Sequence, residues 1–322
     1  MRKRMLVRVA STAIVLAMGL FCTDIALDGT AQADLGQPGV EEPEPDWAPP
    51  DWHPDSETLL GLSDLDAVGP REGLRLRSQA AFVYDVDSGE VLYERAADDR
   101  RPVASLTKLV TALAVSSEEV DLDAETCVSE LFWPSRSGAR SRMSTGECYT
   151  GWDLLGAALV ASDNRAAYGL GVSSGLSYYD FIARMDAVSV DLGMTQSTWA
   201  DPSGLEDDNL STARDMTRAS LAVAVHPVLS IPASARSWTT EKTVEVGIGP
   251  RVRSLHTTNR ASGRDDIEWL SAKTGYTDTA RYCFSGVFRT MEGRTIAVTL
   301  LGANRGHHRW TDLDRVIRSV WD

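Results

Sequence analysis

The chain has 322 residues, of which 43% are hydrophobic and 24% are charged, a composition close to the globular average. It carries 32 Lys and Arg against 46 Asp and Glu, a formal net charge of −14 at pH 7. These values argue against a largely disordered chain and against a membrane bundle, and the acidic balance argues against nucleic acid as the main ligand.

Residues 1–33 have the order of a secretory signal peptide. They begin with Met-Arg-Lys-Arg, continue with a short apolar run and end in Ala-Gln-Ala. The apolar run is shorter than the ~20 residues that cross a bilayer as a helix. We therefore predict an exported protein outside the cytoplasmic membrane. An uncleaved signal that acts as an anchor is the alternative.

Residues 34–70 form a second region of unusual composition. They carry ten acidic side chains, no Lys or Arg, and many prolines. Such a segment buries too little apolar surface to offset the entropy that ordering would cost, so we predict a disordered acidic spacer. A folded domain is then expected at 71–322.

Apolar periodicity predicts alternating secondary structure in this domain. A hairpin is expected at 80–84 and 90–94, and a helix begins at Ser105. Further helices are expected at 152–161, from Asn164, at 178–192 and at 212–225, the last with Ser211 as its N-cap. Strands at 243–246, 271–276, 282–288 and 295–301 precede a terminal helix at 309–321.

Strands at both ends of the domain with helices between them predict an α+β fold. The sheet would be assembled from distant parts of the chain and flanked by helices. No later apolar or amphipathic segment suggests a C-terminal membrane anchor.

The cysteines suggest one disulfide. Cys127 and Cys148 lie at the two ends of a Ser-, Arg- and Gly-rich stretch. Disulfides persist in exported proteins, so we predict that these two are bonded, which would stabilise the fold by about 3 kcal/mol. Cys283 is expected to be a buried thiol. Because no spacing typical of a metal site is present, we predict no metal and no cofactor.

The first chemical motif is Ser-x-x-Lys at Ser105 and Lys108. The chain has four lysines against 28 arginines, so each lysine is a candidate for a special role. A lysine one helical turn from a serine is a candidate base for a serine nucleophile, whereas arginine is never deprotonated in proteins. A working base needs its pKa lowered by ~3 units, which burial beside a second cation would supply.

The second motif is Ser162-Asp163-Asn164, at the break between two predicted helices. Ser162 is a candidate proton relay between Lys108 and the leaving group. The Asn164 amide is a candidate to hold a substrate amide or the lysine. Taken alone, this motif would be read as an ordinary helix N-cap.

The third motif is Lys273-Thr274-Gly275, within a predicted strand. Lys273 supplies a fixed cation, Thr274 a hydroxyl for a carboxylate, and Gly275 lets a substrate backbone lie against the strand. The backbone N–H groups of Tyr276 and Ser105 would together form an oxyanion hole.

In combination and in this order, the motifs resemble those of the low-molecular-mass penicillin-binding proteins, the serine D-alanyl-D-alanine peptidases. The resemblance extends over about 78–321. It includes the blocks R-P-V-A-S-L-T-K-L-V-T-A, L-G-M-T-Q-S-T-W-A-D-P-S-G-L, T-T-N-R and K-T-G-Y-T-D-T-A-R-Y-C. It implies a β-lactamase/transpeptidase-like fold, with a central antiparallel sheet between helical layers.

The resemblance also implies a reaction, in which Ser105 is acylated by the penultimate D-Ala of a peptidoglycan stem peptide. Lys108 is then the base, Ser162 the relay, and Lys273 with Thr274 the substrate clamp. The implied partners are peptidoglycan stem peptides, and β-lactam antibiotics as covalent inhibitors.

Substrate preference stays open between DD-carboxypeptidase and DD-endopeptidase. Arg165 after the second motif and S-T-A-R-D at 211–215 look closer to the DD-endopeptidases. Arg281 stands where the family usually has Gly, which would narrow or recharge the site. Arg260 is expected to be a second carboxylate binder.

Two alternatives belong to other classes. A class A-like β-lactamase needs a Glu-held water, usually in E-x-x-L-N, whereas Glu206 lies in E-D-D-N-L. A catalytically inactive domain that binds β-lactams or the cell wall would keep the pocket but would not need Lys108.

Overall fold

The computed structural model describes residues 74–117, 120–129, 141–244 and 251–320. These residues all belong to one unit, Trp47–Asp322. The predicted signal peptide at 1–33 and the predicted spacer at 34–70 lie outside the described residues.

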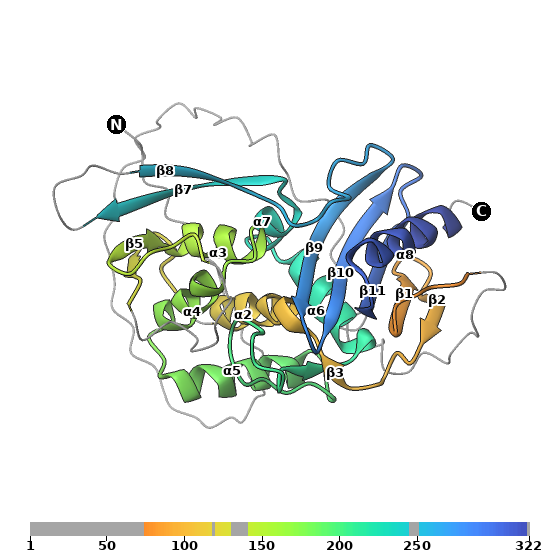
Figure 1. Cartoon of the computed structure of the whole chain (residues 1–322), viewed down its shortest axis with the longest axis horizontal. Coiled ribbons are helices and arrows are strands. Elements are labelled where there is room, and N and C mark those ends of the chain that lie inside the picture. The colour runs from red at the N-terminus through yellow and green to blue at the C-terminus, as the bar shows by residue number, and fades with distance from the viewer. Residues whose placement is uncertain (1–73, 118–119, 130–140, 245–250, 321–322) are drawn as a thin grey trace, which may run out of the picture. The chain divides into compact units, whose positions relative to one another are not determined.

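Five antiparallel strands form the central sheet, in the order β2-β1-β11-β10-β9 (Figure 1). The sheet joins the two ends of the domain, because β1 pairs with β11. An antiparallel sheet built from distant parts of the chain confirms the predicted fold class. The strands are β1 (Ala80–Asp85), β2 (Glu90–Arg95), β9 (Ile267–Thr277), β10 (Arg281–Thr290) and β11 (Thr295–Ala303).

Both faces of this sheet are covered. Successive residues of β1 enter different core clusters: Ala80, Phe82 and Tyr84 enter one, and Ala81 and Val83 the other. Side chains of a strand alternate between its two faces, so each cluster fills one face. A strand buried on both sides needs no polar alternation, which accounts for the continuous apolar run of β1.

Helices supply the other half of each cluster. On one face, α8 (Gly306–Ser319) contributes Leu313 and Val316. On the other face, α6 (Ala213–Val225) packs against the sheet, and α2 (Thr107–Ser116) packs against α6 (Figure 1). The layers are therefore helix, sheet and helix, as the resemblance implied.

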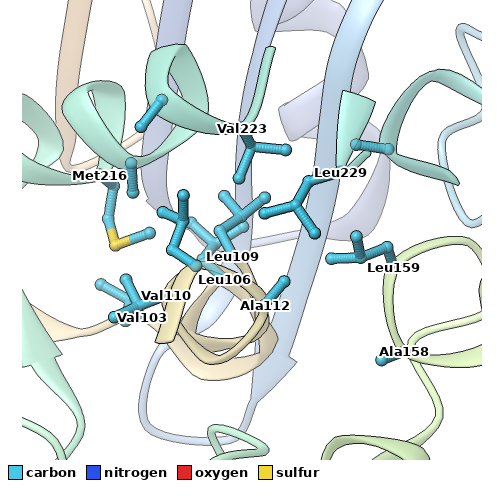
Figure 2. Packing of buried hydrophobic residues seen from close by; sticks show 14 of the residues in the cluster. Val103, Leu106, Leu109, Val110, Ala112, Ala158, Leu159, Met216, Val223 and Leu229 are labelled. Carbon is cyan, nitrogen blue, oxygen red and sulfur yellow. The ribbon is translucent and has the colours of Figure 1, made fainter. Parts of the chain in front are cut away.

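The buried helix α2 lies at the centre of the larger cluster. All of its residues from Thr107 to Val115 are buried. Figure 2 shows Leu106 and Leu109 directed toward Val223 and Leu229. Each fully buried side chain of this size stabilises the fold by about 1.5–3 kcal/mol, so α2 is held firmly in place.

The remaining helices pack beside α2 or against β9. None of the helices within the described ranges is both long enough and apolar enough to cross a membrane. These helices are α3 (Gly151–Leu159), α4 (Asn164–Ser173), α5 (Tyr178–Asp191) and α7 (Ser230–Ser234).

Two smaller sheets complete the described structure. One has four strands, in the order β4-β5-β7-β8, and the other pairs β3 with β6. The strands are β3 (Arg101–Pro102), β4 (Glu125–Cys127), β5 (Glu147–Thr150), β6 (Leu210–Ser211), β7 (Ser237–Val244) and β8 (Arg251–His256).

Several predicted boundaries were wrong. The strand predicted at 243–246 runs instead over Ser237–Val244, and its last two predicted positions lie outside the described residues. Its partner β8 was missed because it is mostly polar, with Leu255 buried. The N-cap of α6 is Thr212, whose hydroxyl accepts the Asp215 N–H at 3.0 Å, whereas Ser211 belongs to β6.

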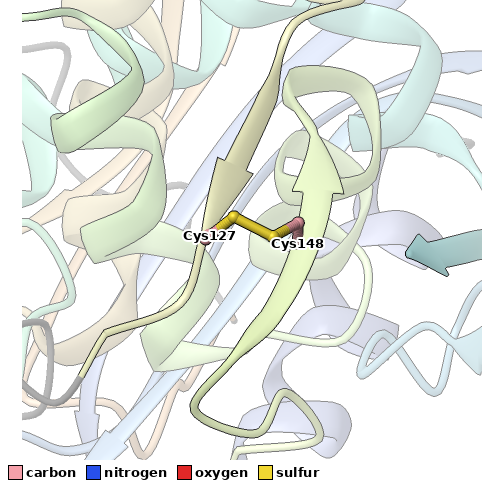
Figure 3. Close-up of a disulfide and its surroundings, with 2 residues drawn as sticks. All are labelled: Cys127 and Cys148. Carbon is pink, nitrogen blue, oxygen red and sulfur yellow. A yellow bond between two sulfur atoms is a disulfide. The ribbon is translucent and has the colours of Figure 1, made fainter. Parts of the chain in front are cut away.

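The predicted disulfide is confirmed. Cys127 of β4 and Cys148 of β5 lie opposite each other in an antiparallel pair, and their sulfur atoms are bonded (Figure 3). Cys283 is a buried free thiol, as expected. The bond fixes one edge of the four-stranded sheet.

The double variant Cys127→Ser/Cys148→Ser should unfold more easily, because the open chain gains entropy when the loop is no longer closed. We expect the free energy of unfolding to fall by about 3 kcal/mol in urea denaturation. The wild-type protein in reductant is the matched control and should lose a similar amount. Equal stability of the variant and the oxidised wild type would contradict this prediction.

Candidate active site

Ser105 lies on a strained turn. It is the middle residue of the 3₁₀ helix η2 (Ala104–Leu106), which leads directly into α2, so the predicted helix starts two residues later than expected. Ala104 has a φ of 51°, a conformation that costs an L-residue roughly 1–2 kcal/mol. Surrounding structure must hold such a turn, and turns of this kind are concentrated at functional sites.

The amine of Lys108 is bonded to three oxygens. Its Nζ lies 3.0 Å from Ser105 Oγ, 2.8 Å from Asn164 Oδ1 and 2.6 Å from the Ser203 carbonyl oxygen. An ammonium has three N–H donors, and all three are therefore used. The predicted pairing of Ser105 with Lys108 and the placement of Asn164 beside the lysine are both observed.

Lys108 is fully buried, and burial lowers its pKa to about 8, against the opposing effect of the Asp201 and Asp163 carboxylates. At pH 7, about one molecule in ten then carries the neutral amine, compared with well under one in a thousand for a solvated lysine. Most of the lowering that a lysine base requires is thus present, and its main cause is loss of solvent.

Ser162 occupies the turn between α3 and α4 in a left-handed conformation, with a φ of 58°. The next residue, Asp163, caps α4 by accepting the N–H groups of Arg165 and Ala166. This cap fixes the turn, and the Ser162 hydroxyl accepts a hydrogen bond from Lys273 Nζ at 2.7 Å. The second motif is therefore both a helix N-cap and part of the site.

The Lys273 side chain is also fully buried. Its Nζ donates to Ser162 Oγ and, at 2.9 Å, to the Thr274 carbonyl oxygen. Burial, followed by the like charges of Lys108 and Arg309, holds the pKa of Lys273 well below its usual range. Lys273 is the second cation that the sequence predicted, but the lowered pKa of Lys108 comes from burial, and the effect of like charge is seen on the pKa of Lys273.

The middle of β9 passes close to the nucleophile. A Cβ atom at Gly275 would lie 2.8 Å from the Val103 carbonyl oxygen and 3.2 Å from Ser105 N, so only glycine allows this approach. On the same strand, Thr274 Oγ1 donates to Thr258 Oγ1 at 2.6 Å. The three predicted motifs therefore converge on one place.

Arg260, the expected second carboxylate binder, lies two residues after Thr258, the hydrogen-bond partner of Thr274, and its role stays a prediction. Arg260 is exposed, whereas Arg309 of α8 is buried behind β9 and donates to the carbonyl oxygens of Gly275 at 3.1 Å and Cys283 at 2.8 Å. Burial and, to a smaller extent, the like charge of Arg260 lower the pKa of Arg309 to about 10. The available signal was its spacing from Leu313, which puts an arginine in the buried stripe of α8.

Tyr276 and Arg281 lie at the outer end of the site. The Tyr276 side chain is 47% exposed, and its hydroxyl donates to Asp278 at 2.7 Å. Arg281 begins β10, pairs with Thr277, is exposed and has a φ of 60°. Glycine adopts this conformation without strain, which accounts for the glycine usual at this position in the resembled family.

Comparison with known proteins agrees with this arrangement. Residues 67–304 match the family described as D-alanyl-D-alanine carboxypeptidase. The chain is 32% identical over 271 residues to a D-alanyl-D-alanine endopeptidase of Pseudomonas aeruginosa, covering 81% of this chain and 85% of that protein. It is 30% identical over 242 residues to a D-alanyl-D-alanine endopeptidase of Escherichia coli, covering 75% and 76%.

The fold has a solved counterpart. The crystal structure of the Streptomyces K15 DD-transpeptidase matches with a TM-score of 0.70 at 22% identity, over 76% of this chain and 97% of that one. This likeness supports the architecture, and the sequence matches establish the kinship. The chain belongs to the D-alanyl-D-alanine carboxypeptidase family of serine-type peptidases.

Proposed function

We propose that Ser105 of this serine DD-peptidase attacks peptidoglycan stem peptides and forms an acyl-enzyme. The observation that carries the proposal is the contact between Ser105 and the fully buried Lys108 amine, whose pKa is lowered to about 8. A neutral amine within hydrogen-bond distance of a serine hydroxyl is the arrangement that activates the nucleophile.

In acylation, neutral Lys108 takes the Ser105 proton while Oγ bonds to the carbonyl carbon of the penultimate D-Ala. The backbone N–H groups of Ser105 and Tyr276 stabilise the resulting oxyanion. The C–N bond then breaks, and the leaving amine receives a proton through Ser162. Water hydrolyses the ester with the same base, which restores the serine.

The clamp is formed by one cation and one hydroxyl of β9. Lys273 and Thr274 bind the substrate carboxylate, and the contact of Thr274 with Thr258 fixes its hydroxyl. The Arg309 guanidinium donates a hydrogen bond to the Gly275 carbonyl oxygen and so fixes the position of the strand beside the substrate. A carboxylate here would also offset the repulsion between the buried cations.

We further propose a preference for cross-linked substrates over free pentapeptides. Three relatives that are 30% identical or more are named D-alanyl-D-alanine endopeptidases, and a relative at 30% identity is named a D-alanyl-D-alanine carboxypeptidase. Arg165 follows the second motif and donates to the Met143 carbonyl oxygen at 2.7 Å, which fixes the segment beside the Ser162 turn. The signal-like residues 1–33 support export to the compartment that holds this substrate.

The β-lactamase and the inactive binding domain are not favoured by any observation. The relatives are named as peptidases, and Lys108 has the buried environment of a working base.

Ser105→Ala should abolish covalent labelling by a fluorescent penicillin, because the attacking oxygen is lost. Mass spectrometry of the wild-type adduct should place the label on the peptide that contains Ser105. Ser88→Ala, in the β1–β2 turn, is the control and should label normally. A labelled Ser105→Ala protein would contradict the assignment.

Lys108→Arg should reduce the labelling rate by at least about a thousandfold, since guanidinium keeps the charge but cannot accept the proton. Wild-type labelling should rise with pH around a midpoint near 8, the pKa to which burial lowers Lys108. Lys242→Arg changes the remaining lysine of the predicted domain and should leave the rate unaltered. Appreciable labelling of Lys108→Arg would show that Lys108 is not the base.

Purified wall fragments distinguish the two substrate preferences. We expect the enzyme to convert cross-linked dimers to monomers faster than it releases free D-Ala from pentapeptides. Chromatography of the products measures both rates, and Ser105→Ala should show neither activity. Release of D-Ala with no loss of dimers would overturn the endopeptidase assignment.

A further inference from the structure

One block of the sequence, D-P-S-G-L at 201–205, has no role in the reaction as described above. Its aspartate has no solvent exposure and accepts five hydrogen bonds. One carboxylate oxygen accepts the N–H groups of Ser203 and Gly204 and the Ser203 hydroxyl. The other accepts the Glu206 N–H at 2.6 Å and the Asn209 amide at 3.0 Å. Asp201 therefore organises the loop 201–209 from within.

This loop contacts the segment that carries Ser105 and Lys108 at two points. The Ser203 carbonyl oxygen lies 2.6 Å from Lys108 Nζ, the shortest of the three contacts of that amine. The neighbouring Gly204 has a φ of +81°, and a Cβ there would lie 2.0 Å from the Ala104 carbonyl oxygen. The loop is thus packed against the backbone just before Ser105.

The far end of the loop, at Asn209, is also hydrogen-bonded to the segment that precedes Ser105. Asn209 Oδ1 accepts the N–H groups of Ala200 and Asp201, so that the two ends of the loop are joined. The Asn209 carbonyl accepts the Val103 N–H at 3.3 Å. Asp201 and Asn209 therefore couple the loop to the segment that carries the nucleophile.

The contact from Ser203 matters most when Lys108 is neutral. A neutral amine has two N–H bonds and one lone pair. The Asn164 and Ser203 oxygens take the two hydrogens, which leaves the lone pair directed at the Ser105 hydroxyl. If the Ser203 carbonyl moved away, only Asn164 would still hold an N–H of the amine, so the lone pair could turn away from Ser105 and the proton transfer would lose its alignment.

Three charged groups face Lys108 from the elements packed around it. Asp163 at the start of α4 and Asp201 in the loop favour its cationic form and raise its pKa, while burial lowers it. Lys273 on β9 is the third, and the charge of Lys108 lowers its pKa. All five donors to Asp201 are uncharged groups, so its negative charge remains to act on the lysine.

We propose that Asp201 is the positioning residue of Lys108. It orders residues 201–209 so that the Ser203 carbonyl holds one N–H of the amine and the lone pair points at Ser105. This inference rests on the proposed function, because it concerns the base of the acylation step.

Asp201→Asn tests the inference with little change of shape. The amide loses the negative charge and presents donors where the Glu206 N–H and the Asn209 amide now donate. We expect the maximal rate of penicillin acylation to fall about tenfold or more. We also expect the midpoint of the rate–pH profile to move down by about half a unit or more, because an opposite charge no longer favours the Lys108 cation.

Asp215→Asn is the matched control. Asp215 is also buried and accepts the Gln196 N–H at 3.0 Å and the Ser197 hydroxyl at 2.9 Å, but it belongs to α6 and pairs with Arg218. The Asp215→Asn substitution should lower the melting temperature of the protein and leave the midpoint of the rate–pH profile unchanged. A profile of Asp201→Asn identical to this control would overturn the inference. So would an upward shift of the midpoint, because Asp201 would then act mainly by excluding water.

Asn209→Ser supplies a second test in case Asp201→Asn does not fold. It loosens the loop but keeps the Asp201 charge, so the maximal rate should fall severalfold with a smaller shift of the midpoint. An unchanged rate would contradict the proposal. Failure of the wild type to label at Ser105 would instead overturn the proposed function, so the two failures are distinguishable.

Discussion

The site depends on the removal of one amine from water. Lys108 is buried on α2, and the lost hydration, rather than repulsion by a neighbouring cation, is the main cause of its lowered pKa. The charged form of Lys108 is disfavoured because the packing of α2 among the surrounding helices excludes water from the amine. Catalytic competence is therefore a property of the core as much as of the motif.

The amine is held by groups from separate parts of the chain. Ser105 comes from the turn before α2, Asn164 from the start of α4, and the Ser203 carbonyl from a loop that follows α5. Lys273 of β9 is hydrogen-bonded to Ser162, in the turn that precedes Asn164. Because these elements are fixed by different contacts, the geometry depends on all of them.

The side chains of the site could be predicted from the sequence, since S-x-x-K, S-x-N and K-T-G are short motifs with a clear chemical purpose. The backbone acceptor at Ser203 could not, because any residue type supplies a carbonyl. The role of Arg309 was missed, because its spacing from Leu313 places it on the buried stripe of α8 but does not show that it reaches the Gly275 and Cys283 carbonyl oxygens of the sheet. The strand β8 escaped prediction because its side chains are mostly polar, and strands of that kind carry little periodic signal.

The pairing of strands from the two ends of the domain has a consequence for the timing of folding. Ala80 of β1 pairs with Leu301 of β11, and the pocket itself combines Ser105 with β9, near the other end of the domain. Contacts so distant in sequence form late and slowly. A nascent or partly assembled chain would hold Lys108 in contact with solvent and fully protonated, and therefore inert. Reactivity of Ser105 therefore depends on the assembly of segments from both ends of the domain.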